Sequence, residues 1–561
     1  MLRALAVISL ASIAIVRFGQ SSSPQATFEV ADVHVSARST TPIMRTAVRG
    51  GRYELQNATM VDLIRTAYGI DAENVFGGPS WVEFDRFDVI AKVGAKTPDE
   101  TLKSMLQALL ADRFKLSIHN DTKPMPTFVL TQGKGKHKLK EADPSGKTGC
   151  EAPPLAIRVV DGRVNAQTNA TCRNMTMAAF AADLRRLAAG YFTTSVLDST
   201  ELKGAWDFEF KFTPRTLSIL AAGDSISIID AVDKQLGLTL EEKSLPRTVL
   251  VIDQVNRKPT ENPPDLEKRL PALPAAEFEV ATLKPVDQSF RPAAPGFLGV
   301  QPGGRVNLPP LSLRSLMSLA WGPLVNLEDM VGAPKWIDSA RFEIVAKVPA
   351  EYIPSNGPSA TSLLDIGPMM QALITEQFKM KAHFEDRPVT AYTLVAAKPK
   401  LKKADPSART GCKSATAAGG FSVGGPMPLP STQVTCQNIT MTQFADQLQI
   451  IASSYVRRPV VEATGLEGAW DFAFTFTIIN PAQLANLRVA TPFGNPAEAG
   501  GASDPVGGTS LFDALEKQLG LKLEQGKRSY PVLVIDHIEP MEGQIDGPGL
   551  PNIAVPVPIP R

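Results

Sequence analysis

The most regular pattern in the chain is an alternation of aromatic and polar residues that occurs twice. The stretch 204–212, GAWDFEFKF, returns at 468–476 as GAWDFAFTF. Within each stretch every second residue from the tryptophan on is aromatic, and a period of two predicts a strand with one buried aromatic face. A serine-capped amphipathic helix follows each copy and ends in KQLG, at 234–237 and at 517–520. The chain is therefore an internal duplication.

Further matches extend the duplication over most of the 561 residues. Both repeats begin with FEV and close on VLVID, and between these ends they share GGR, a tryptophan turn, QAL, ADPS and TC in the same order. We predict an α+β fold in which each repeat consists of two small helix-on-sheet units. The predicted boundaries are 27–256 for repeat 1, with sub-units 27–135 and 160–256, and 277–540 for repeat 2, with sub-units 277–398 and 430–540.

Local signals define the ends of the predicted helices and two hairpins in each repeat. Thr59 and Thr176 are predicted N-caps, and the glycine that ends KQLG suits a left-handed C-cap. In repeat 1 a turn around 123–126 is predicted to reverse the chain. A second hairpin is predicted to join LxLE to the closing VLVID strand.

The two ends of the chain and the segment between the repeats differ in composition from the rest. Arg3 precedes an apolar run at 4–16, which predicts a signal peptide over 1–22 and a periplasmic or extracellular protein; a retained membrane anchor is the alternative. The Pro-rich segment 257–276 is predicted to be a stiff extended linker. The Pro-rich tail 541–561 is predicted to be unstructured, or to be a polyproline ligand.

Charge narrows the class of partner. With 58 basic and 57 acidic residues the formal net charge is +1, so no global field attracts nucleic acid, and we expect no nucleic-acid partner. The basic runs 134–140 and 398–403 recur in both repeats; they fit solvated loops or a surface that steers an acidic partner. No later segment is apolar enough to span a membrane, so none is expected after signal cleavage.

Four cysteines occupy equivalent places in the two repeats. Cys150 and Cys172 form one pair by position, and Cys412 and Cys436 form the other. One disulfide in each repeat is the simplest interpretation for an exported protein. A four-thiolate zinc site needs CxxC-type knuckles, which the sequence lacks, so no metal and no cofactor is predicted.

Candidate catalytic or binding residues are few. His119 and His383 are equivalent in the duplication and are candidate proton-transfer groups or ligands, although a half-exposed structural histidine fits as well. Arg52 and Arg305, each after two glycines, are candidates for holding an anion, or they simply follow a tight turn. The motifs GxSxG, SxxK, HExxH and GxxxxGK[ST] are missing from the sequence.

The ordered set of motifs FEVA, GGR, GGPSW, FDVIAK, ADPS, GAWDFEF, KQLGL and VLVID resembles an exported family of unknown function. This is the Solibacter-type domain that is expanded in acidobacteria, and it is present here as two tandem copies. The resemblance implies no activity. In element order the units also resemble the small N-terminal domains of secretins and TonB-dependent transducers, which bind protein partners. We therefore expect a non-enzymatic binding, sensing or scaffold protein of the cell envelope with a protein or peptide partner; the alternative is a cell-envelope hydrolase that uses His119 and His383.

Overall fold

The computed structural model describes most of the two repeats. The described residues are 26–36, 44–94, 97–143, 145–152, 158–160, 163–165, 167–188, 190–192, 194, 196–215, 225–272, 276–286, 300–301, 303–321, 330–352, 366–405, 408–417, 431–458, 460–478 and 509–541. The predicted signal peptide and nearly all of the predicted tail lie outside them. No helix in the described part of the chain is long and apolar enough to cross a membrane.

The first unit of repeat 1 is a four-stranded antiparallel sheet packed against two helices. The strand order is β1-β5-β3-β2, and α1 and α2 pack together over its apolar face. Its elements are β1 (Ala31–Val35), β2 (Arg45–Arg49), β3 (Arg52–Thr59), α1 (Met60–Tyr68), η1 (Ala72–Asn74), β4 (Val75–Gly77), η2 (Ser80–Glu83), β5 (Arg86–Lys92), α2 (Asp99–Arg113) and β6 (Ser117–Gln132).

The second unit repeats this order with a sheet β7-β13-β11-β8. Its elements are β7 (Lys140–Glu141), β8 (Gly149–Glu151), β9 (Arg158–Val160), β10 (Arg163–Asn165), β11 (Thr168–Met175), α3 (Met177–Leu187), β12 (Val196–Asp198), β13 (Trp206–Phe212), α4 (Ile228–Ala231), η4 (Val232–Leu236) and β14 (Leu238–Gln254). The series β3, α1, β4, β5, α2, β6 therefore corresponds to β11, α3, β12, β13, α4 with η4, and β14.

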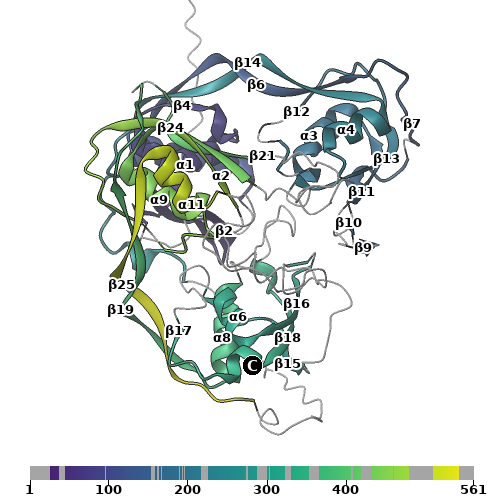
Figure 1. Ribbon diagram of the computed structural model, residues 1–561. Helices are drawn as coiled ribbons and strands as arrows, with labels where there is room; N and C mark the ends of the chain where they lie inside the picture. Colours follow the sequence, from purple (N-terminus) through teal and green to yellow (C-terminus); the bar gives the residue numbers. More distant parts are fainter. Residues whose placement is uncertain are drawn as a thin grey trace, which may run out of the picture.

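The two units of a repeat exchange their last strands. β6 pairs antiparallel with β14 along its whole length, which forms a ribbon that runs along the top of Figure 1 between the α1–α2 and α3–α4 lobes. β4 of the first unit pairs in parallel with β14, and β12 of the second unit pairs in parallel with β6. Accordingly Ile252, near the end of β14, packs in the first core, and Leu130, near the end of β6, packs in the second.

This ribbon corrects two predictions. The predicted turn around 123–126 does not exist, because β6 continues through it, and LxLE and VLVID are one strand, β14, rather than the arms of a hairpin. Prolines in the middle of both strands suggested turns. Proline is compatible with a strand where its nitrogen points outward from the ladder, and the facing pair Pro124–Pro246 satisfies this condition. The sub-unit boundaries stay predictions, and the two cores share strands across them.

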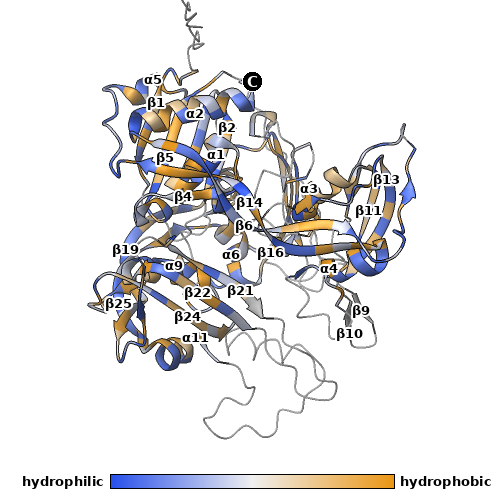
Figure 2. Ribbon diagram, turned by 90° about the horizontal axis from the view of Figure 1, so that it is seen from above, coloured by the Kyte–Doolittle hydropathy of each residue, from blue (hydrophilic) through white to orange (hydrophobic). Residues whose placement is uncertain are grey.

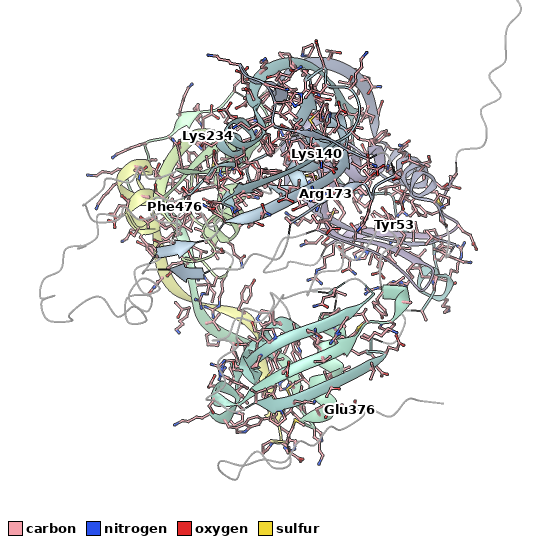
Figure 3. All side chains as sticks on the ribbon, turned by 90° about the vertical axis from the view of Figure 1, so that its right-hand side faces the viewer. Tyr53, Lys140, Arg173, Lys234, Glu376 and Phe476 are labelled. Atoms are coloured by element: carbon pink, nitrogen blue, oxygen red, sulfur yellow. A yellow bond between two sulfur atoms is a disulfide. The ribbon has the colours of Figure 1, made fainter. Side chains whose placement is uncertain are left out.

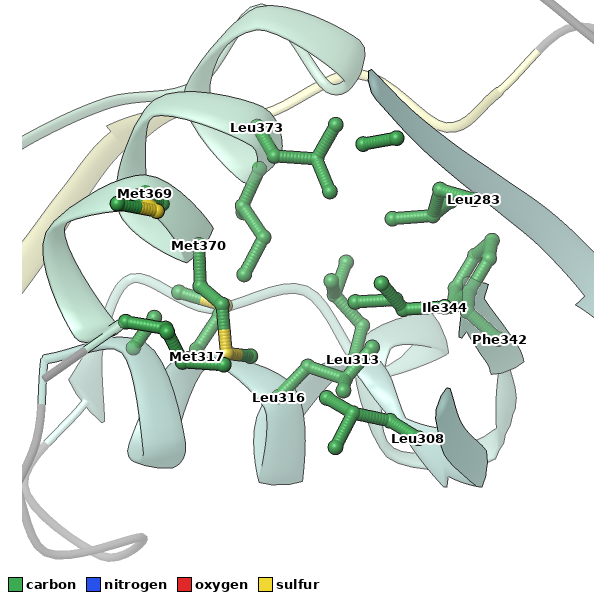
Figure 4. Packing of buried hydrophobic residues seen from close by; sticks show 14 of the residues in the cluster. Leu283, Leu308, Leu313, Leu316, Met317, Phe342, Ile344, Met369, Met370 and Leu373 are labelled. Atoms are coloured by element: carbon green, nitrogen blue, oxygen red, sulfur yellow. The ribbon is translucent and has the colours of Figure 1, made fainter. Parts of the chain in front are cut away.

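Repeat 2 has the same construction. Its sheets are β15-β18-β16, β20-β24-β22-β21, and the ribbon sheet β17-β25-β19-β23. Figure 4 shows the core of its first unit, where α6 and α8 pack against the sheet. The elements are β15 (Val280–Val286), β16 (Arg305–Ser312), α6 (Leu313–Ala320), β17 (Met330–Val331), α7 (Trp336–Ser339), β18 (Arg341–Lys347), η7 (Ala350–Tyr352), α8 (Gly367–Gln377), β19 (Lys381–Ala396), β20 (Lys402–Lys403), β21 (Gly411–Ala417), β22 (Ser431–Thr440), α9 (Met441–Ile451), β23 (Val461–Glu462), β24 (Ala469–Thr477), α11 (Leu511–Ala514), η9 (Leu515–Leu519) and β25 (Leu521–His537).

The aromatic strands are buried as their alternation predicts. The phenylalanines of β13 and β24 lie in the cores, and Phe210 and Phe474 are each 1% exposed. Trp206 is also buried, whereas Trp470 is half-buried beneath the Lys403 ammonium, which lies 4.0 Å from the ring centroid. Hydrophobic and hydrophilic residues alternate along these strands in Figure 2. The strands therefore form core and not a stacking surface.

The predicted helix ends are confirmed. Thr59 forms a capping box with Asp62, and the Ser227 hydroxyl accepts a hydrogen bond from Asp230 N. Gly237 and Gly520 adopt left-handed C-caps. At Gly520 a Cβ would collide with the Lys398 carbonyl oxygen, so no other residue fits there.

The predicted linker lies against repeat 1 and includes a short helix, α5 (Leu266–Arg269). Arg113, 6% exposed at the end of α2, donates hydrogen bonds to the Thr260 carbonyl and to Asn262 Oδ1, both at 2.6 Å. Arg52 donates to the Pro271 carbonyl at 2.6 Å. This part of the chain is therefore an attached strap and not an extended spacer.

Candidate functional site

Both candidate histidines pair with an aspartate on the ribbon of their repeat. The distance from His119 Nδ1 to Asp253 Oδ1 is 2.7 Å, and that from His383 Nδ1 to Asp536 Oδ2 is 2.8 Å. Each aspartate is the last residue of the VLVID motif of its repeat. The structure therefore joins two residues that are far apart in the sequence into one equivalent pair in each repeat.

A β-bulge near the end of the long strand positions each aspartate. In repeat 1 the register shifts between Ile252 and Gln254, so Asp253 is the extra residue of β14. In repeat 2 a shift at the same place leaves Asp536 as the extra residue of β25. Bulges re-aim side chains, and here the bulge aims the carboxylate at the imidazole on the neighbouring strand.

Further charged residues continue from each histidine along the same face of the ribbon. After His119 these are Asp121 and Lys123, whose charged groups are 3.7 Å apart. After His383 they are Glu385 and Arg387, joined by a 2.8 Å hydrogen bond that lowers the pKa of the Glu385 carboxyl. We call these sets the charged rows: Asp253, His119, Asp121 and Lys123 in repeat 1, and Asp536, His383, Glu385 and Arg387 in repeat 2.

The charged rows face solvent. The His119 and Asp253 side chains are 53% and 43% exposed, and those of the repeat 2 pair are similar. In water an ion pair of this kind contributes at most about 1 kcal/mol to stability. Fold stability therefore depends little on these pairs.

The chemistry available at each pair is limited. A carboxylate at Nδ1 fixes the orientation of the imidazole and leaves Nε2 for proton transfer or hydrogen bonding. Within the described residues no serine, threonine or cysteine side chain hydrogen-bonds to either ring, and no group of three or more His, Cys, Asp or Glu residues converges on a possible metal position. A shallow depression in repeat 1 is lined by Asp32, Asn262, Asp265, Leu266 and Lys268, which belong to β1 and the linker and not to the rows.

The candidate arginines are placed differently from each other. Arg52 donates through Nε to Glu54, which is 2% exposed and also accepts a hydrogen bond from Arg49. Arg52 Nη1 donates to the carbonyl of Pro271 in the linker. Arg305 is exposed and bonds to Asn307. The glycines before both arginines have positive φ angles and form tight turns into β3 and β16. This geometry matches the turn interpretation of GGR.

Both predicted disulfides are present, Cys150–Cys172 and Cys412–Cys436. Each joins directly opposite residues of two antiparallel strands. Such bonds indicate an oxidising location outside the cytoplasm.

The aspartates beside the tryptophans hold a bulge. Asp207 accepts a hydrogen bond from Asn174 N at 2.8 Å, and Asp471 does the same for Asn438 N. Asn174 and Asn438 both have positive φ angles, and each side-chain amide also binds the loop before the disulfide. In the first unit Asn57 and Asp88 repeat this bulge contact. These aspartates therefore stabilise the local backbone.

The basic runs have a structural use as well. Lys138 Nζ donates to the Lys234 carbonyl, and Lys400 Nζ donates to the Lys517 carbonyl, each at the C-terminal end of the KQLG helix. Cations are favoured at that end of a helix. Figure 3 labels Lys140 and Lys234 in the second unit.

The sequence signal for the rows is the recurrence of one short pattern. His119 to Pro124 reads HNDTKP and His383 to Pro388 reads HFEDRP, so both copies keep His-x-acid-x-base-Pro. The aspartate partner cannot be read from this pattern, because it depends on how β6 pairs with β14. Comparison of the two repeats could therefore have revealed the row, but not the aspartate that pairs with the histidine.

The duplication agrees with a comparison against protein families. A family described as protein of unknown function (DUF3738) matches residues 61–255 and 314–538. The chain belongs to this family. The two DUF3738 matches lie within the two repeats, and each ends within two residues of the paired aspartate of its charged row. No curated protein and no solved structure matches the chain.

Proposed function

We propose that this protein is an exported, non-enzymatic binding or scaffold protein of the cell envelope, and that a protein or peptide partner contacts its two charged rows. The observation that carries the proposal is the recurrence of the same exposed row on the ribbons of both repeats. Both disulfides support an extracytoplasmic location. The small secretin and TonB-type domains, which the units resemble in element order, bind proteins without catalysis, and this analogy supports the same class of function.

The faces of the ribbons fit a partner better than their edges do. Pro124 and Pro246 face each other across the first ribbon, and Pro388 and Pro531 lie in the second. At these positions a residue other than proline would point its N–H outward, toward an added strand. Proline removes that donor and blunts the edge, which disfavours recognition by strand addition. The partner is therefore expected to contact the side chains of the charged rows and not the backbone at the ribbon edges.

Site-specific photo-cross-linking tests this contact. A photoreactive residue replaces Lys123 or Arg387 in the exported protein, and cross-linked adducts are identified from envelope fractions. The matched controls are Thr122 and Asp386, exposed neighbours whose side chains alternate to the other face of the same strands. We expect adducts from the row positions and few from the controls. Equal adducts at both, or none at the row positions, would refute the proposal.

A cell-envelope hydrolase is the second candidate function, and the His–Asp pairs are the observation that favours it. A histidine oriented by a carboxylate is one part of many hydrolytic sites. The test compares the wild type with the variant H119Q/H383Q on esters, amides and glycosides. The binding proposal predicts no histidine-dependent turnover. Turnover that is present in the wild type and lost in the variant would establish the hydrolase instead.

A further inference from the structure

The linker covers the outer face of the first sheet of repeat 1, which is the face turned away from α1 and α2. It passes round the free edge of β1, where Asn262 Oδ1 accepts a hydrogen bond from Val33 N and Asn262 Nδ2 donates to Asp32. It then reaches β3, where Arg52 Nη1 donates to the Pro271 carbonyl. Asp32 and Arg52 alternate with core residues of their strands, so their side chains lie on the outer face. The linker therefore crosses this face from β1 to β3.

Apolar surface is buried on this side of the sheet as well. Val30, next to β1, is 4% exposed and Leu266 of the linker is 8% exposed, although neither belongs to the core that α1 and α2 form with the sheet. Leu266 lines the shallow depression beside Asp32, and Figure 2 shows α5, which begins at Leu266, next to β1. The linker therefore forms a third layer over the sheet of repeat 1.

The equivalent face of repeat 2 is exposed. Val280, the counterpart of Val30 in the FEV motif, is 55% exposed. Arg305, the counterpart of Arg52 in the GGR motif, is also exposed, whereas the Arg52 side chain is 11% exposed. Lys347 of β18 lies opposite both Val280 and Arg305, so these two residues belong to one row across the sheet. Two positions that are mostly buried in repeat 1 therefore face solvent in repeat 2.

A second exposed valine lies in the next row of this face. Val345 of β18 is 38% exposed and lies opposite Thr282 of β15. In repeat 1 the same two places hold Ile90, which is half-buried, and Asp32, to which the linker is bonded. Exposed apolar residues that lie together often mark a contact surface. We call this surface the open face of repeat 2, and it consists of Val280, Thr282, Arg305 and Val345.

The chain leaves both ribbons in the same way. After β14 Asn256 N donates to the Phe114 carbonyl, and after β25 Glu539 N donates to the Phe378 carbonyl, both at 2.8 Å. In repeat 1 the chain continues as the linker and reaches the outer face of the sheet. In repeat 2 it continues into the Pro-rich tail. The linker and the tail therefore start from equivalent places.

The tail is long enough to follow the course of the linker. Asp253 and Asp536 are equivalent, so linker residues 257–271 correspond without gaps to 540–554, and the sequence continues to 561. Residues 542–561 lie outside the described part of the chain, and like the linker they contain many prolines. Proline favours an extended chain with few backbone donors, which suits a segment that lies across the face of a sheet.

The polar contacts that hold the linker have less polar counterparts in repeat 2. In repeat 1 Asn262 is hydrogen-bonded to both Asp32 and Arg113. The residues at the three equivalent positions in the tail and in repeat 2 are Ile545, Thr282 and Gln377. None of the three is charged, so both sides of the corresponding contact are suited to apolar packing.

We propose that the tail, residues 542–561, docks on the open face of repeat 2 as the linker docks on repeat 1. Apolar side chains of the tail cover Val280 and Val345. Arg305 donates to a carbonyl of the tail, as Arg52 does to one of the linker. The open face belongs to the sheet β15-β18-β16 and not to the ribbon, so this contact is independent of the proposed function.

Attachment to the same chain favours this occupant over others. Met541, the last described residue, packs against the first core of repeat 2, so the tail begins beside the unit that carries the open face. A short tether gives a segment an effective concentration in the millimolar range, so a weak contact is enough to keep it docked. The tail of a second copy lacks this advantage.

Photo-cross-linking within the full exported chain tests the proposal. A photoreactive residue replaces Val345, and mass spectrometry of the digested monomer maps the captured peptide. We expect intrachain cross-links to residues 542–561. The same residue at Ile90 is the positive control and should capture the linker. Ile450, a 46% exposed residue on α9, is the negative control and should capture far less of the tail.

A second substitution tests whether the tail rests on the open face. V280D places a carboxylate beneath the docked tail, and burial of an unpaired carboxylate is costly. The cross-link from position 345 to the tail should therefore be mostly lost in V280D. V461D is the matched control, because Val461 on β23 is also an exposed valine of repeat 2, at 42%, and this variant should keep the cross-link.

Three results would overturn the proposal. The first is a folded chain in which position 345 captures the tail no more than position 450 does. The second is a cross-link from position 345 that joins two copies of the chain or another protein instead of the chain's own tail. The third is a V280D variant that keeps the full cross-link, because the tail would then not cover the open face.

Discussion

The strand exchange within each repeat predicts that a substitution late in the chain destabilises the first unit. Ile252 lies near the end of β14, is 5% exposed, and packs in the core formed by α1, α2 and their sheet. Truncation of a buried isoleucine to alanine costs about 2–5 kcal/mol. A value of about 3 kcal/mol corresponds to a roughly 150-fold increase in the opening equilibrium of that core, at about 1.4 kcal/mol for each factor of ten.

Native-state hydrogen exchange followed by mass spectrometry measures this effect segment by segment. Leu240→Ala is the matched control, because Leu240 is on the same strand and 4% exposed but packs in the second core. We expect I252A to increase exchange in α1 and α2 by about 100-fold, with a much smaller effect in α3, and L240A to do the reverse. If I252A increased hydrogen exchange mainly in α3, the end of β14 would not pack in the first core, and the strand pairing described for the ribbon would be wrong.

Three further predictions concern residues that hold the fold together. Replacing Cys150 and Cys172 by serine should lower the free energy of unfolding by about 3 kcal/mol, because the disulfide closes a loop with a sequence separation of 22. Urea titration of the variant and the wild type measures the difference, and no difference would exclude the bond. Arg113→Met leaves its linker acceptors unsatisfied at a cost of about 2–4 kcal/mol and should expose the linker to limited proteolysis, whereas an uncut linker would contradict its attachment. Burial raises the pKa of Tyr53. Above the ordinary tyrosine value of about 10 the unfolded chain therefore releases a proton that the folded chain keeps, and the free energy of unfolding falls as the pH rises. Tyr53→Phe should reduce this loss of stability in melting curves recorded at alkaline pH, and an unchanged dependence of the melting temperature on pH would contradict it.

Local structure could be predicted well from the sequence, because it depends on short-range patterns. The alternation around Phe210 predicts a buried strand face, and Thr59 and Ser227 predict helix starts that the structure confirms. The disulfides were also predictable, since each pair occupies the same place in both repeats.

The ribbons could not be predicted in the same way, because strand pairing is not local. Pro124 and Pro246 are both strong turn signals, yet they face each other in one continuous ladder. The pairing of His119 with Asp253 depends on that ladder and on one bulge, so neither residue indicated the other. The salt bridge between Arg409 and Glu83 could not be predicted either, since the two residues belong to different repeats and no local pattern connects them.

The most direct test of the proposed function measures how the two charged rows contribute to binding. Neutral variants of one row (H119A/D121N/K123Q/D253N), of the other (H383A/E385Q/R387Q/D536N) and of both are compared with the wild type by biolayer interferometry on the partner identified by cross-linking. We predict that each single-row variant weakens binding by a similar factor and that the variant of both rows abolishes it. Wild-type affinity in a folded chain with both rows neutralised would contradict the account.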